Sequence, residues 1–174
     1  YGFFYAPLVI TGLHHMFLAV DFQLMGSSLK GTYLWPIVAI SNICQGSAAF
    51  GAWLIYKRRK MAKEEGLALT SGVSAFLGVT EPAMFGVNLP LKVPFFAAIC
   101  TSGILGAVIG ANRVLGNVGV GGVPAFISIQ SKYWYIYIPV ILLAMILPAV
   151  LTVVFSKFTK VKAKEMVENP DDIK

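Results

Sequence analysis

One carboxylate stands out among the residues that could do chemistry, because it lies in an apolar, glycine-rich stretch. Glu81 precedes Pro82 in the middle of segment 66–89. An acid inside a membrane segment is costly and marks a functional site by default. This one could accept hydrogen bonds from sugar hydroxyls or receive a hydroxyl proton. A structural role, in the headgroup region or paired with Lys92 or Arg113, is the alternative. We favour function, because the break at the proline would also expose backbone polar groups to a cavity.

The two histidines, His14 and His15, are the next candidates for substrate binding. Adjacent residues of a helix point to different faces, so at most one of the two is expected to face a cavity. Asp21 follows His14 by about two helical turns and could share its face. A metal site is not expected, because zinc needs more ligands and the chain has no other histidine.

Neutral amides form a third group of candidates. Asn88, Asn42 and Gln45 lie in apolar surroundings. Such side chains suit sugar hydroxyls, and we include Asn88 among the substrate-binding candidates, although hydrogen bonding between membrane helices is the more frequent use. The glycine-rich run 116–122 lacks the strand–turn–helix setting of a nucleotide-binding loop, so no ATP site and no cofactor are expected.

Membrane helices must position these residues. The 174 residues are 57% hydrophobic and 13% charged, with a mean hydropathy of +0.74. Soluble domains carry about 25% charged residues, so a soluble enzyme is excluded, and so is a disordered chain. The expected fold class is an all-α integral membrane protein with transmembrane spans at about 34–56, 93–111 and 134–155 and a re-entrant helical hairpin at about 66–90. A helix of that hairpin should stop at Glu81-Pro82.

The distribution of charge supports this topology. The net charge is +6, and basic residues cluster at 57–63 and 157–164, just after two apolar runs. Such clusters are typical of loops that face the cytoplasm, and they do not indicate binding of nucleic acid. The two crossings 93–111 and 134–155 connect the clusters, so the hairpin must add none. We expect residues 1–163 to be the C-terminal part of a larger permease and 164–174 to be a polar tail or linker.

Two further features of the sequence lead to expectations about local structure. The stretch before residue 21 is apolar but interrupted, which indicates a broken or re-entrant element. Cys44 and Cys100 lie inside apolar segments and are expected to be small core residues, without a disulfide.

A long motif resembles a known family. Residues 78–89 read Gly-Val-Thr-Glu-Pro-Ala-Met-Phe-Gly-Val-Asn-Leu, and residues 12–15 read Gly-Leu-His-His. Both resemble signatures of enzyme IIC, the sugar-transporting membrane subunit of the phosphoenolpyruvate-dependent sugar phosphotransferase system, glucose superfamily. The resemblance covers nearly all of the chain up to about residue 155. Segments 21–25, 119–124 and 127–130 are more similar to the trehalose type than to the sucrose type.

The resemblance implies a group translocator in the bacterial cytoplasmic membrane that imports a disaccharide, most simply trehalose, and phosphorylates its 6-hydroxyl. It implies that Glu81 and His14 or His15 contact the sugar. It also implies a phosphocysteine donor on an enzyme IIB domain, an upstream enzyme IIA and a homodimer of the full-length protein. Neither cysteine of this chain is expected to carry phosphate. The alternatives are a sucrose or other disaccharide permease of the same system, an ion-coupled sugar transporter in which Glu81 carries a proton, and a membrane interaction module without a substrate.

Overall fold

Long helices dominate the computed structural model, which describes residues 1–28 and 30–158. Three helical segments are long and apolar enough to cross a membrane. They are α3 (Leu34–Arg58), α7 (Val93–Ala111) and the stretch Ser131–Lys157, which contains most of α8 (Trp134–Phe158). The expected all-α membrane fold class is therefore confirmed, and the three segments cover the three expected spans. The expected polar tail at 164–174 lies outside the described residues.

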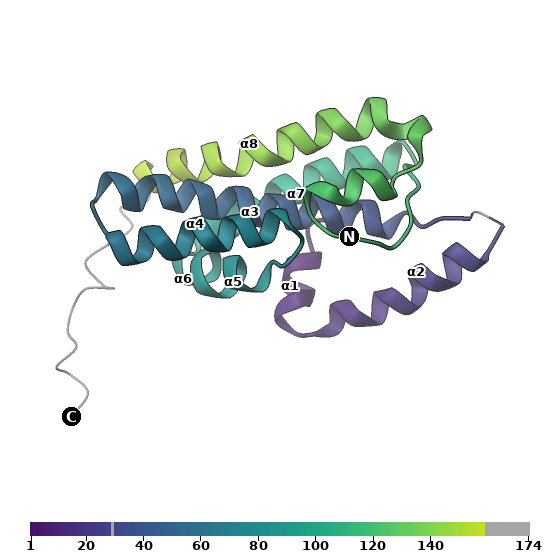
Figure 1. Cartoon of the computed structure of the whole chain (residues 1–174), viewed down its shortest axis with the longest axis horizontal. Helices are drawn as coiled ribbons and strands as arrows, with labels where there is room; N and C mark the ends of the chain where they lie inside the picture. Colours follow the sequence, from purple (N-terminus) through teal and green to yellow (C-terminus); the bar gives the residue numbers. More distant parts are fainter. Residues whose placement is uncertain (29, 159–174) are drawn as a thin grey trace.

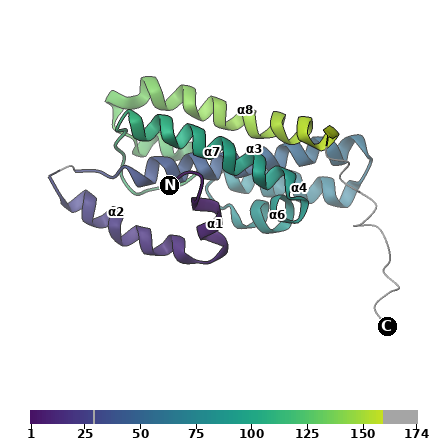
Figure 2. The ribbon, with the colours of Figure 1, turned by 180° about the vertical axis from the view of Figure 1, so that it is seen from behind.

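Helix α3 is the centre of the bundle. It packs against α8, α7 and α4 (Ala62–Phe76), and Figures 1 and 2 show these helices around it from both sides. Small residues permit the close approach. A methyl group added to Gly46 would lie 2.7 Å from a ring carbon of Phe76, and one added to Gly51 would lie 2.8 Å from the carbonyl oxygen of Ala149. Close packing through small residues is the usual means by which membrane helices associate.

Polar groups inside the bundle are paired between helices. The Ser47 hydroxyl of α3 donates to the carbonyl oxygen of Met145 at 2.7 Å and accepts from the Ala149 N–H at 3.1 Å. An unbroken helix would bond that N–H to that carbonyl directly. Pro148 lies inside α8 at this point, so Ser47 supports a helix that a proline has weakened.

The segment after α4 turns back along it. After a turn at 77–80, the chain continues through α5 (Glu81–Ala83), the π-helical turn η2 (Met84–Asn88) and α6 (Leu89–Leu91). Both α5 and η2 contact α4. The expectation that a helix stops at Glu81-Pro82 was wrong by a few residues. The first helix ends at Phe76, and Pro82 instead lies in the first turn of α5, where its missing N–H leaves no bond unmade.

The N-terminal part of the chain forms an arm beside the bundle. This arm consists of α1 (Tyr5–Ile10), the 3-10 turn η1 (Leu13–His15) and α2 (Met16–Gly26) (Figure 1). Gly12, with φ of +75°, lies at the reversal between α1 and η1. The element is thus broken, as its sequence indicates.

The arm joins α3 through a small hydrogen-bonded junction. The Thr32 hydroxyl donates to the Asp21 carboxylate and accepts from the Leu34 N–H at 3.0 Å. The backbone N–H and carbonyl of Thr32 pair with Gly116 at 2.8 and 3.1 Å. This junction ties α2, the start of α3 and the loop after α7 together. That loop contains the short 3-10 helices η3 (Val123–Ser128) and η4 (Ser131–Tyr133).

Candidate functional site

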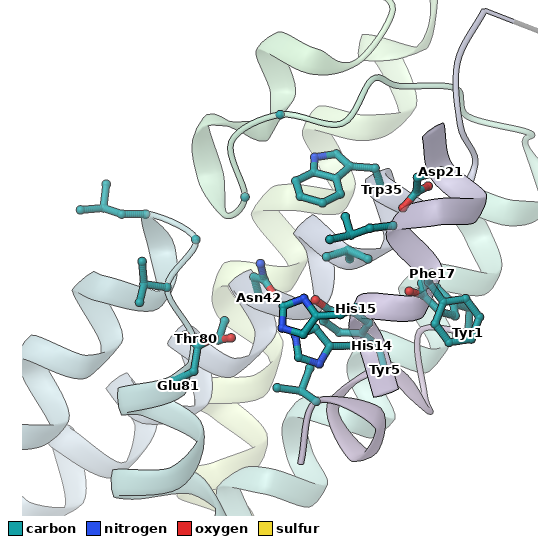
Figure 3. A pocket seen from close by; sticks show the side chains of 18 residues that line it. Tyr1, Tyr5, His14, His15, Phe17, Asp21, Trp35, Asn42, Thr80 and Glu81 are labelled. Atoms are coloured by element: carbon teal, nitrogen blue, oxygen red, sulfur yellow. The ribbon is translucent and has the colours of Figure 1, made fainter. Parts of the chain in front are cut away.

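A cavity of about 380 Å³ lies where the arm faces the bundle (Figure 3). Its wall comes from the arm, the first half of α3, the turn before α5 and the glycine-rich loop after α7. Its volume falls within the range of roughly 300–1,000 Å³ that is usual for small-molecule sites. The cavity therefore collects side chains from segments that are far apart in the sequence.

Glu81 is the first residue of α5 and lines this cavity. Its side chain is exposed, and it has no hydrogen-bond or ion-pair partner in the described part of the chain. The structural alternative, an ion pair with Lys92 or Arg113, is thus not seen there. A carboxylate with free lone pairs at the edge of a cavity can accept hydrogen bonds from a bound ligand.

Both histidines line the cavity, so the expectation that at most one would face it was wrong. They belong to the turn η1, before α2 begins, and the rule for opposite faces of an α-helix does not apply there. Their rings lie close together in a tilted arrangement, with centroids 3.9 Å apart and planes at 38°. In Figure 3 both imidazoles point from the arm toward the side that carries Thr80 and Glu81.

The His14 imidazole is shifted toward its neutral form. Burial lowers its pKa, and the neighbouring His15 lowers it further, while the Leu8 carbonyl and Glu81 partly oppose both effects. A neutral imidazole offers one donor and one acceptor, which suits a hydroxyl group that both donates and accepts.

Asp21 lines the cavity too, but its carboxylate is already engaged. The side chain is 1% exposed and accepts hydrogen bonds from the Thr32 hydroxyl and the Trp35 backbone N–H. Burial raises its pKa, and these two hydrogen bonds lower it in part. The geometry gives Asp21 the position of an anchor between the arm and the start of α3.

Asn88 is not a wall residue of the cavity, and its assignment to substrate binding is corrected here. Its side chain is fully buried, and its amide nitrogen donates to the backbone and side-chain oxygens of Gln45 at 2.9 and 2.7 Å. The residue therefore joins η2 to α3, the alternative use of such amides. Sequence alone could not decide between substrate binding and hydrogen bonding between helices, because Asn88 lies in the same motif as Glu81.

Four aromatic side chains, from the start of the chain, the arm and α3, were missed as cavity residues by sequence reasoning. Tyr1, Tyr5, Phe17 and Trp35 line the cavity (Figure 3). Tyr1 packs on Phe17 with ring centroids 5.0 Å apart, and Tyr5 meets His14 edge to face at 6.0 Å. Aromatic faces of this kind suit the apolar C–H faces of sugar rings. The density of aromatic residues before residue 20 was the available signal.

Glycines bring the turn before α5 and the loop after α7 into contact. Gly78 has φ of +105°, and a methyl group added there would lie 2.9 Å from Gly121. Gly78, Gly119 and Gly121 all line the cavity. Only residues without side chains allow these two backbone segments to approach so closely beside the site.

The described side chains include no candidate metal site. In residues 1–28 and 30–158, no three His, Cys, Asp or Glu side chains are grouped to hold an ion. Cys44 is buried and Cys100 is exposed, and both are free thiols. The expectation of a core position therefore holds for Cys44 and fails for Cys100, which lies on an outward face of α7.

Comparisons with known proteins point to one family. The family model described as "Phosphotransferase system, EIIC" matches residues 1–103. The trehalose-specific EIIBC component of Bacillus subtilis is 52% identical over 91% of this chain and 33% of its own length. The trehalose-specific EIIBC component of Escherichia coli is 46% identical over 87% of this chain and 32% of its own length. The sucrose-specific EIIBC component of Staphylococcus xylosus is 49% identical over 79% of this chain and 29% of its own length. The chain thus spans about a third of these relatives. No solved structure matches it.

Proposed function

Because the chain belongs to the EIIC family of the phosphotransferase system, we propose that it forms the sugar-binding part of a permease that imports trehalose and delivers it as the 6-phosphate. The observation that carries this proposal is the convergence of Glu81, His14 and His15 on one cavity. Hydrogen-bonding groups with aromatic neighbours are what a disaccharide requires. The trehalose-specific relatives support the choice of sugar.

The position of the cavity along α3 is compatible with a transporter. Asn42, on its α3 wall, precedes Lys57 at the basic end of α3 by about 15 residues, or roughly 22 Å of helix. If the basic end faces the cytoplasm, the α3 wall of the cavity lies within the bilayer, whose apolar core is about 30 Å thick, in the half away from the cytoplasm. Transporter sites lie within the membrane, where irregular backbone is tolerated because it lines a cavity.

In the proposed reaction, Glu81 and the histidines hold the disaccharide while its 6-hydroxyl meets a phosphocysteine on an enzyme IIB domain. The hydroxyl oxygen forms a new bond to phosphorus as the sulfur–phosphorus bond breaks. The hydroxyl proton passes to the Glu81 carboxylate, and the cysteine leaves as its thiolate. This chain contributes binding, orientation and the acceptor of the hydroxyl proton, and the partner domain contributes the phosphoryl group.

The proposal includes the partners, the oligomeric state and the location of the full-length protein. An upstream enzyme IIA supplies phosphate to the IIB domain, the full-length permease is a homodimer, and the bacterial cytoplasmic membrane is its location. The names of the relatives, which are EIIBC components, support the IIB partner.

The test is transport by vesicles that contain the intact permease and the complete phosphate relay, supplied with labelled trehalose. Labelled trehalose 6-phosphate inside the vesicles is the expected product. Free trehalose inside would overturn group translocation in favour of an ion-coupled transporter. Competition by sucrose that exceeds self-competition by trehalose would shift the substrate to sucrose.

A further inference from the structure

Asn42 supplies the carboxamide on the α3 wall of the cavity, and this amide has no partner among the described residues. It lines the cavity and is 6% exposed, and no described residue makes a hydrogen bond to its side chain. Gln45, one turn further along α3, does not line the cavity; its side-chain oxygen accepts from Asn88, and its enclosed Nε2 atom has no described partner. Buried amides are almost always hydrogen-bonded, and an exception calls for an explanation.

The accessible part of Asn42 faces the cavity. Its amide atoms are not among the fully enclosed polar atoms that lack a partner, so the small exposure of this residue reaches them. Figure 3 shows the amide near Thr80 and the two imidazoles. A methyl group added to Gly121 would lie 2.9 Å from its Nδ2 atom, so a glycine at this point of the loop keeps the space beside the amide free.

From these observations we propose that Asn42 is a substrate-binding residue that hydrogen-bonds the hydroxyl groups of the disaccharide. A carboxamide offers two donor hydrogens and an acceptor oxygen, and two hydroxyls on neighbouring carbons of a sugar ring can engage both ends. The inference rests on the proposed function and adds a contact from the bundle, opposite the contacts from the arm. Asn42 would then help to determine which sugars bind. A sugar without a hydroxyl at this point leaves the buried amide without a hydrogen bond and binds more weakly.

The experiment measures trehalose binding by calorimetry on the intact permease, with wild type, Asn42→Ala and the control Asn112→Ala. Asn112 is an exposed residue at the end of α7 whose amide bonds only the Val108 carbonyl, at 2.8 Å. Loss of the contact should weaken binding by about ten- to hundredfold in Asn42→Ala and leave the control unchanged. Thermal unfolding of each variant reports on the fold, and Asn42→Ser serves if the alanine variant does not fold.

Monodeoxy trehaloses distinguish a direct contact from a structural effect. At least one analogue should bind wild type about tenfold more weakly than trehalose and lose that penalty in Asn42→Ala. Equal affinity of wild type and Asn42→Ala would overturn the inference and leave water as the partner of the amide. An equal loss for every analogue, with a lowered melting temperature, would also overturn it. A wild type that binds neither trehalose nor sucrose would instead overturn the proposed function, and this inference with it.

Discussion

Replacing Gly78 by alanine should damage the site without touching any of its side chains. The backbone φ of +105° is outside the region that residues with a Cβ adopt readily, which costs about 1–3 kcal/mol. The added methyl would also lie 2.9 Å from Gly121, where about 3.5–4 Å is comfortable, so the turn and the loop must separate. Glu81 begins α5 three residues later, so the shift reaches the carboxylate. Because the sugar needs Glu81 in its wild-type position, binding must restore the strained contact, and a cost of about 2 kcal/mol then corresponds to about a thirtyfold loss of sugar affinity.

The matched control is Gly66→Ala, in the other half of the same hairpin. Gly66 lies within α4, and a methyl group there would meet nothing within 4 Å. Alanine in a helix interior should stabilise the protein by about 0.5–1 kcal/mol. Both variants are to be compared by thermal unfolding and trehalose binding in the intact permease. Unchanged stability and affinity in Gly78→Ala would refute the argument that contact between two glycine turns positions Glu81.

Three further predictions concern the arm and the bundle. Thr32→Val should leave the buried Asp21 carboxylate without its hydroxyl donor, which costs about 1–3 kcal/mol. Amide hydrogen exchange in α2 should then become faster, and an unchanged exchange rate would argue against Asp21 as an anchor between the arm and α3. Ser47→Ala should lower stability by about 1–3 kcal/mol through the lost pairing with α8, and a melting temperature equal to that of wild type would contradict this role. Burial and His15 lower the His14 pKa, so His14 is neutral at pH 7. Sugar affinity should therefore stay constant above the ordinary histidine value of about 6.5 and fall in more acidic solution, as His14 becomes protonated. The variant His14→Gln should lose this fall in affinity at acidic pH, and a pH profile equal to that of wild type would exclude His14 as its source.

The sequence predicts the helices better than the site, for physical reasons. Membrane spans are marked by length and hydropathy, which are local properties, so α3, α7 and α8 could be placed directly. The cavity depends on which distant segments meet. Periodicity could not reveal that His14 and His15 lie on a 3-10 turn and share a wall.

Amides show the same limit. Asn42 and Asn88 cannot be distinguished in the sequence, because both lie among apolar residues. In the structure Asn88 donates to Gln45, whereas Asn42 lines the cavity. A tertiary contact decides between binding and packing, and no pattern along the chain encodes it. Glu81 could be identified because a carboxylate in an apolar segment is informative in itself.

The central claim is that Glu81 holds the sugar in this cavity, and the most direct test is calorimetric titration of the intact permease with trehalose, as wild type and as Glu81→Gln. The exchange retains the size of the side chain and removes the charge. The account predicts that affinity falls by about ten- to hundredfold, as expected for a lost hydrogen bond to a charged group, while thermal unfolding is unchanged. Identical affinity of the two proteins for trehalose would contradict it.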